Sequence, residues 1–480
     1  MGLKDRAVSG VKWNSVATIY AMVVQILRLA ILTRLLAKSD FGLVAIATMV
    51  INFTDIFSDL GITVAIISKT NITREQYSSV FWLNAITSAV IFTIVCLVSP
   101  LIASFYNEQI LVYIIPLLGV QILLNSFGKM FQTIKTKNLE FSFISRIRIL
   151  SVTIGFVFTI VLAYLGMGVY SLVTGHLIQV FVNQIIFIVC GIHEERILFH
   201  FNIREIKDML VVGGYKLGSS FLDFVSEKID VFLIGKFFGM DDLGVYNLAK
   251  ELVLKPFQVI KSVINNVASA TFAKMQGDDE RLRVNYSKLV RAVGFIAIPI
   301  YIATFVFSDF IVSILYANEF FGVAVFLRIL SIVGMITSID GVASTLQIAL
   351  GRTDIGMKWT VVRVCISVTS IYIASFFSIY AVAIGQALVA IICYFLYWRF
   401  AIYSLIKLKL KDYLLCVFES LGVGVVLSIP FLLINTLFKF DVYWQLLELL
   451  LFGISYLLYY YFVRMDILKT YTVDFIRRRQ

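Results

Sequence analysis

The stretch Lys216-Leu-Gly-Ser-Ser-Phe-Leu-Asp-Phe-Val-Ser-Glu-Lys-Ile-Asp230 decides how the rest of the chain is interpreted. It lies in a long apolar run, yet polar residues recur in it at steps of four, three, four and three, so they share one helix face. A charge at the centre of a membrane helix costs ~2.5–3.5 kcal/mol. This face must therefore meet water or partner charges. It consists of Lys216, Ser220, Asp223, Glu227 and Asp230.

The composition sets the class of the protein. Of the 480 residues, 60% are hydrophobic and only 15% are charged, which is more apolar surface than a soluble chain can bury. We therefore predict an all-α polytopic membrane protein. The five cysteines all lie in apolar runs and form no CxxC pair, so neither a disulfide framework nor a metal site is expected.

Apolar runs of about 20 residues predict about fourteen membrane spans. Basic residues gather on alternate connections between them, which places both termini in the cytoplasm. The net charge of +11 thus reflects topology, and we expect no binding to nucleic acid. The predicted spans lie near 12–36, 41–67, 80–104, 110–133, 147–166, 169–190, 210–236, 243–268, 288–307, 323–349, 357–378, 380–401, 413–435 and 443–463.

An internal repeat relates the two halves. Residues 34–42 (RLLAKSDFG) align without a gap on residues 236–244 (KFFGMDDLG), an offset of 202. The same offset superimposes the polar face of the first span on that of the seventh, so that Arg28 corresponds to Asp230. Six spans separate the repeats, so both halves have the same orientation, and transporters built this way bind substrate between their halves.

These observations predict a division of the chain into two lobes with additions. Residues 1–190 form an N-terminal lobe of six spans, and 191–209 a cytoplasmic linker with an amphipathic helix. Residues 210–401 form a C-terminal lobe of six spans. Two additional spans follow in 412–463, and 464–480 is a basic cytoplasmic tail.

Charges within the spans are the candidate functional residues. Stripes at related places in both halves favour one shared, water-filled cavity, although some of these charges would serve equally well as structural pairs, such as Glu251 with Lys255. Basic side chains in a membrane cavity suit a phosphate-bearing substrate. The acids either hold the bases in place or bind a coupling H⁺ or Na⁺. The predicted substrate-binding residues are Arg28, Lys216, Lys250, Lys255 and Lys261, and the cavity-lining or ion-coupling residues are Asp55, Asp59, Asp223, Glu227 and Asp230.

Several motifs resemble the polysaccharide-transporter family of bacterial lipid-linked oligosaccharide flippases, within the multidrug/oligosaccharidyl-lipid/polysaccharide exporter superfamily. They are residues 34–45, Phe57-Ser-Asp-Leu-Gly-Ile62, Phe81-Trp-Leu-Asn84, residues 229–236, Leu243-Gly-Val-Tyr246 and the run from Pro256 to Asn265. Within this family, the motifs resemble the branch that exports O-antigen, capsule or exopolysaccharide repeat units.

The resemblance implies two six-helix lobes in a bacterial cytoplasmic (inner) membrane. They would flip an undecaprenyl-pyrophosphate-linked oligosaccharide from the inner to the outer leaflet by alternating access. The partners that it implies are this carrier, membrane lipid, and a polysaccharide polymerase or assembly proteins that receive the product. No cofactor is implied, apart from a coupling H⁺ or Na⁺.

Two other functions are compatible with such a chain. A cation-coupled multidrug antiporter of the same superfamily would share the lobes, but would favour acids in its cavity. A membrane enzyme, either a polysaccharide polymerase or a ligase, would need a site on a sizeable external loop, and the sequence shows neither such a loop nor a nucleophile–base constellation. The sequence also lacks a G-x-x-x-x-G-K-[ST] phosphate loop. We therefore expect a transporter rather than an enzyme.

Overall fold

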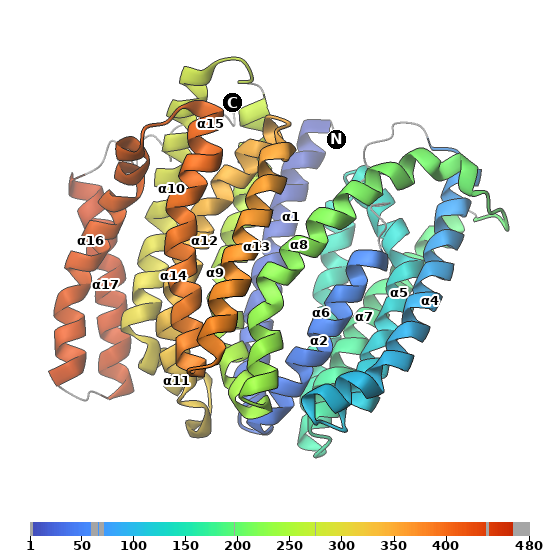
Figure 1. Ribbon diagram of the computed structural model, residues 1–480, viewed down its shortest axis with the longest axis horizontal. Helices are drawn as coiled ribbons and strands as arrows, with labels where there is room; N and C mark the ends of the chain where they lie inside the picture. Colours follow the sequence, from blue (N-terminus) through green and yellow to red (C-terminus); the bar gives the residue numbers. More distant parts are fainter. Residues whose placement is uncertain are drawn as a thin grey trace. The chain divides into compact units, whose positions relative to one another are not determined.

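The computed structural model describes residues 3–58, 66, 72–195, 197–273, 275–437 and 441–463 (Figure 1). In these residues the regular structure is entirely helical. Twelve helices of the described chain are long and apolar enough to cross a membrane. This confirms the predicted class of all-α polytopic membrane protein. The total of fourteen spans stays a prediction, because α8 and α9 are as long but are not among these twelve.

The helices follow the predicted apolar runs closely. The first nine elements are α1 (Leu3–Leu32), α2 (Lys38–Ser58), α4 (Arg74–Tyr106), α5 (Leu111–Lys137), α6 (Phe141–Tyr164), α7 (Val169–Glu195), η1 (Ile203–Ile206), α8 (Lys207–Phe237) and α9 (Met240–Ala273). The remaining elements are α10 (Asp279–Val306), α11 (Ser308–Leu315), η2 (Asn318–Phe320), α12 (Val323–Ala349), α13 (Thr353–Ser375), α14 (Ile379–Tyr397), η3 (Trp398–Ile402), α15 (Tyr403–Ile406), α16 (Leu410–Leu437) and α17 (Val442–Val463). The stretch expected to form an amphipathic linker helix is the short turn η1, which runs directly into α8.

The chain packs into two compact units. The first comprises Met1–Leu248 with the segments Leu315–Phe320 and Ser367–Ile379, and the second comprises the rest. In the first unit α1 packs against α6, α6 against α7, α7 against α5, and α5 against α4 and α2, while α8 packs against α2. In the second unit α10 packs against α12 and α16. The two-lobe division predicted from the repeat stays a prediction.

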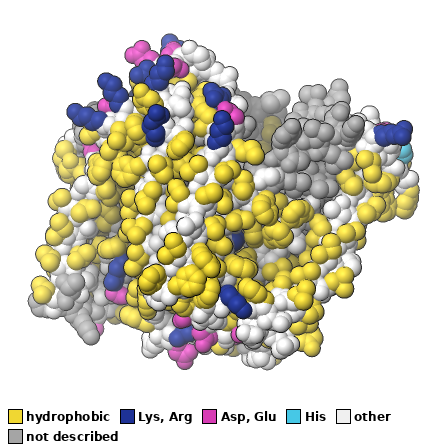
Figure 2. Space-filling model, in the orientation of Figure 1, with side chains coloured by type: hydrophobic (Ala, Val, Ile, Leu, Met, Phe, Trp, Pro, Cys, Tyr) yellow, Lys and Arg dark blue, Asp and Glu magenta, His cyan; other side chains and the backbone are white. Residues whose placement is uncertain are grey.

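Large apolar side chains cover the helix sides, as a lipid environment requires. Figure 2 shows hydrophobic side chains along the helices and charged side chains mostly near the helix ends. On α4, Leu97 is 72% exposed and Leu101 is 69% exposed. Such surfaces would be unfavourable in water, so the exposure agrees with the membrane class.

The internal repeat reappears as a symmetric contact inside the first unit. A Cβ atom added at Gly42 of α2 would collide with the carbonyl oxygen of Met240, the first residue of α9. A Cβ atom added at Gly244 of α9 would collide with the carbonyl oxygen of Lys38, the first residue of α2. Lys38 and Met240 are related by the same offset as the two glycines, so the repeated segments pack on each other about a local pseudo-twofold axis.

Two equivalent basic residues of the repeat bind helix C-termini. The Arg34 guanidinium donates to the carbonyl oxygen of Ala30 in the last turn of α1 and, at 3.5 Å, to that of Leu315. Lys236 Nζ donates to the carbonyl oxygen of Phe105 in the last turn of α4, at 2.6 Å. Cations are favourable at helix C-termini, where carbonyl groups lack intrahelical partners. This role explains two bases that lie on otherwise base-poor connections.

We predict that Gly42→Ala and Gly244→Ala each lower the thermal unfolding midpoint of the purified protein, and by similar amounts. Alanine gains up to about 1 kcal/mol of helix propensity, but overpacking costs about 1–3 kcal/mol, and a backbone carbonyl cannot rotate away as a side chain can. Gly453→Ala is the matched control, since nothing lies within 4 Å of its added Cβ. A Gly42→Ala protein as stable as wild type would contradict the close contact.

Candidate functional site

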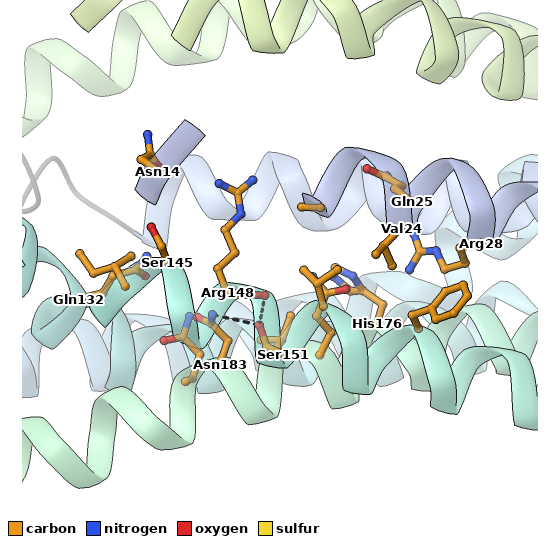
Figure 3. A pocket seen from close by; sticks show the side chains of 17 residues that line it. Asn14, Val24, Gln25, Arg28, Gln132, Ser145, Arg148, Ser151, His176 and Asn183 are labelled. Atoms are coloured by element: carbon orange, nitrogen blue, oxygen red, sulfur yellow. Dashed lines mark hydrogen bonds between the residues drawn. The ribbon is translucent and has the colours of Figure 1, made fainter. Parts of the chain in front are cut away.

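A polar cavity of about 510 Å³ lies within the first unit, between α1, α5, α6 and α7 (Figure 3). We name it the N-terminal cavity. All four helices precede residue 196, so the cavity belongs to the predicted N-terminal lobe. It is lined by Asn14, Ala21, Val24, Gln25, Arg28, Gln132, Ile144, Ser145, Arg148, Ser151, Val152, Phe156, His176, Gln179, Val180, Asn183 and Gln184.

The polar face of α1 supplies one wall. Asn14, Gln25 and Arg28 all line the cavity. Their spacing of eleven and three residues is close to whole helical turns, so their side chains point the same way. Thr18, the fourth polar residue of this face, accepts a 3.3 Å hydrogen bond from Arg148 Nη1 on α6. The face predicted from periodicity thus meets a polar interior.

Close helix packing positions the amides of α7. A Cβ atom at Gly128 of α5 would collide with the Gln184 side chain, and one at Gly155 of α6 would collide with that of Gln179. The two glycines therefore leave the room that these long side chains occupy. Gln184 Nε2 also donates to Asn125 Oδ1 at 2.9 Å, which fixes the orientation of that amide.

Hydrogen bonds also orient the opposite wall. Asn183 Nδ2 donates to Ser151 Oγ at 3.3 Å, and Ser151 Oγ in turn donates to the carbonyl oxygen of Arg148 at 3.1 Å (Figure 3). His176 Nε2 and Gln121 Oε1 are 2.8 Å apart. Most of these partners come from different helices, so the polar groups are held in place before any substrate binds.

The electrostatic character of the cavity is cationic. Arg28 is half-buried and Arg148 is exposed to the cavity, and in the part of the chain that the structure describes no aspartate or glutamate lines it. Guanidinium groups bind phosphate through two parallel hydrogen bonds. Amide and hydroxyl groups add both donors and acceptors. The cavity can therefore hold an anionic group together with a hydroxyl-rich one.

The sequence predicted Arg28 as a site residue, but it did not predict the cavity-lining residues of α6 and α7. Arg148 is one of the bases whose positions indicate the topology, and its role at the cavity follows only from the packing of α6 on α1. The residues of α7 that line the cavity are not among the predicted site residues. The signal was present in the spacing of His176, Gln179 and Asn183, which follows the helical period as clearly as the face of the first span.

Asp230, the last residue of the polar face within residues 216–230, is fully buried. Its Oδ2 accepts a 2.6 Å hydrogen bond from the Tyr246 hydroxyl, and its Oδ1 accepts one from the Val231 N–H at 2.8 Å. A buried carboxylate needs such donors, because losing water is costly for a charged group. In this structure Asp230 joins α8 to α9.

The remaining predicted residues lie outside the N-terminal cavity. Of the predicted side chains that the structure describes, only Arg28 lines it. In the first unit Asp55 and Asp223 are half-buried and Glu227 is exposed. In the second unit Lys250 is half-buried, Lys255 is buried, and Lys261 lies 5.5 Å from the Phe257 ring centroid. Asp59 and the side chain of Lys216 lie outside the described residues.

A second depression in the first unit has the opposite chemistry. This apolar groove of about 690 Å³ lies between α2, α4 and α8, and Lys228 is the one charged residue among the described residues of its lining. Its surface suits a hydrocarbon chain. The lining residues are Met49, Val50, Phe53, Thr54, Ile94, Val95, Val98, Leu101, Ile102, Phe105, Tyr106, Phe224, Val225, Lys228, Ile229 and Phe232.

The chain is similar in sequence to proteins of polysaccharide biosynthesis. A family model described as "Polysaccharide biosynthesis protein" matches residues 31–325. Lipopolysaccharide biosynthesis protein WzxC of Escherichia coli (strain K12) is 27% identical over 436 residues, which cover 91% of this chain and 88% of that protein.

Two solved structures share the fold. The lipid II flippase MurJ in an inward closed conformation superimposes with a TM-score of 0.73 at 14% identity, over 96% of this chain and 99% of that one. A multidrug resistance MATE family transporter in an inward-facing conformation gives a TM-score of 0.65 at 17% identity, over 82% of this chain and 99% of that one. The fold is therefore shared by carriers of different substrates, and the residues of the site must distinguish them.

We predict that Tyr246→Phe destabilises the protein, because the buried Asp230 carboxylate loses a hydrogen-bond donor. Hydrogen bonds to charged groups contribute about 1.5–3 kcal/mol. A double-mutant cycle of Tyr246→Phe with Asp230→Ala, in which thermal unfolding measures the stability of each variant, should show a coupling free energy of this size. Tyr443→Phe is the control, since Tyr443 is 85% exposed. Additive effects in the cycle would rule out the pair as a structural bond.

Proposed function

The chain belongs to the polysaccharide biosynthesis protein family, and on this premise we propose that it translocates a lipid-linked oligosaccharide across a bacterial cytoplasmic membrane. The proposed carrier is undecaprenyl pyrophosphate, moved from the inner to the outer leaflet by alternating access. Its hydrocarbon stays in the bilayer while the phosphates and sugars pass through a polar cavity. The names of two similar proteins, a lipopolysaccharide biosynthesis protein and a lipid II flippase, support this assignment.

One observation carries the proposal: among the described residues that line it, the N-terminal cavity presents Arg28 and Arg148 and no acid. A diphosphate crossing the apolar core needs its charge compensated, since an isolated ion in hydrocarbon is very unfavourable. Fixed guanidinium groups provide that compensation and match the geometry of phosphate. The neighbouring amides and hydroxyls suit the sugar hydroxyls that follow the phosphates.

The same observation disfavours export of cationic drugs. The MATE transporter shares the fold, but the two arginines that line this cavity would repel a positively charged drug. Translocation also makes and breaks no covalent bond, so the proposal requires a transporter and no catalytic residue. A polymerase or ligase would need such residues.

The apolar groove between α2, α4 and α8 supplies the complementary surface. A polyprenyl chain has no polar group to satisfy, so it requires only apolar contact. The groove and the N-terminal cavity both belong to the first unit. The proposal thus assigns hydrocarbon and headgroup to surfaces of matching polarity.

The direction of transport and its driving force belong to the same proposal. The bias of basic residues toward alternate connections supports cytoplasmic termini in the inner membrane. Coupling to H⁺ or Na⁺ would use carboxylates within the spans, such as Asp223 and Glu227. Asp230 suits this role less well, because its oxygens already accept hydrogen bonds from Tyr246 and Val231. A polymerase or assembly protein would receive the product at the outer face.

We predict that Arg28→Gln slows translocation at least about tenfold, the effect of losing one charge-assisted hydrogen bond to the diphosphate, and that Arg148→Gln also slows it, because it removes positive charge from the same cavity. The assay uses liposomes that contain the purified protein and a fluorescent undecaprenyl-pyrophosphate-linked oligosaccharide. A quencher that cannot cross the membrane measures how much substrate changes leaflet. Because both arginines contribute to one cationic cavity, the double variant should be slower than either single variant.

Arg146→Gln is the matched control for this experiment. Arg146 lies two residues from Arg148 on α6, its guanidinium carbon is 5.3 Å from the Trp13 ring centroid, and it does not line the cavity. Its variant should transport at the wild-type rate. Normal translocation by the Arg28→Gln, Arg148→Gln double variant would refute the role of the cavity.

A further inference from the structure

We infer that one end of the N-terminal cavity is a saccharide subsite, formed by Gln132 of α5 and Asn183 of α7 beside Arg148. The inference rests on the proposed function and names the part of the site that selects the sugar. In Figure 3, Gln132, Ser145 and Asn183 lie toward the same end of the cavity as Arg148, whereas Arg28 lies toward the other end. The two ends therefore differ in the side chains that they present.

The two ends are too far apart to share one diphosphate. Arg148 Nη1 donates a hydrogen bond to the Thr18 hydroxyl on α1. Arg28 lies ten residues further along the same helix. At a rise of 1.5 Å per residue, the Thr18 and Arg28 positions are about 15 Å apart along the axis of α1. This distance is greater than the length of a diphosphate. A diphosphate held by Arg28 does not reach Gln132 and Asn183, but the saccharide attached to it does.

The chemistry of the lining exceeds what a phosphate requires. Phosphate oxygens only accept hydrogen bonds, whereas each carboxamide offers a donor and an acceptor. Sugar hydroxyls use both. If the cavity held only a diphosphate, the carbonyl oxygens of these amides would be repelled by the phosphate oxygens, since both carry negative charge. The abundance of amides therefore indicates a ligand with hydroxyl groups. The amide residues of the lining are Asn14, Gln25, Gln132, Gln179, Asn183 and Gln184.

These amides are also available to a ligand. Within the described part of the chain, the side chains of Gln132 and Gln179 form no hydrogen bond to protein. Asn183 donates one hydrogen bond, to Ser151 at 3.3 Å, which orients its amide while its carbonyl oxygen stays an acceptor. A saccharide would satisfy groups that water must otherwise satisfy, and only a hydroxyl pattern that matches them would do so fully.

The test measures binding to the purified full-length protein by isothermal titration calorimetry. The probes are farnesyl diphosphate without sugar and farnesyl diphosphates that carry glucose, galactose, N-acetylglucosamine or glucuronic acid. We expect the wild-type protein to prefer one sugar over the others by about tenfold. Gln132→Met and Asn183→Leu keep the side-chain size but remove the amide, and each should reduce this preference severalfold. The affinity for sugarless farnesyl diphosphate should be retained in both.

Gln347→Met is the matched control, because Gln347 is a buried glutamine of α12 in the second unit. It should leave both the sugar preference and the diphosphate affinity unchanged. Equal binding of all sugars by wild type, an unchanged preference in both amide variants, or an equal loss of sugared and sugarless probes would overturn the subsite. Failure of wild type to bind sugarless farnesyl diphosphate would instead overturn the proposed function together with the subsite.

Discussion

Polar side chains on membrane helices must be solvated or paired, and this constraint organises the first unit. An intramembrane charge costs ~2.5–3.5 kcal/mol even on insertion scales, so Arg28 and Arg148 require a polar environment. Glycines at positions 128 and 155 let long amide side chains fit between closely packed helices. The small glycines and the long amide side chains together allow α5, α6 and α7 to pack closely and still enclose a polar cavity.

The internal repeat encodes close contacts between the two segments that it relates. Its glycines allow the first turns of α2 and α9 to meet backbone to backbone, and its basic residues at 34 and 236 bind helix C-termini. The repeated sequence therefore encodes local contacts that depend on small size and on positive charge. This explains why a short segment is similar in both halves although the polar faces beside it differ in charge.

Periodicity predicted the helices and the face of α1, because apolar length and helical spacing are properties of a single segment. It did not predict that Arg148 joins Arg28, since that depends on how α6 packs on α1. Asp230 shows the same limit. Its spacing placed it with Asp223 and Glu227 on one polar face, but the Tyr246 hydroxyl from the next helix holds its carboxylate in the interior. Partners between helices are set by tertiary packing, which spacing within one helix does not encode.

The central claim is that a cationic cavity inside the first unit holds the diphosphate of a lipid carrier. The most direct measurement is a cryo-EM structure of the protein with undecaprenyl pyrophosphate bound. We expect diphosphate density in the N-terminal cavity, within hydrogen-bonding distance of the Arg28 guanidinium. Diphosphate density elsewhere, with this cavity containing only water, would contradict it.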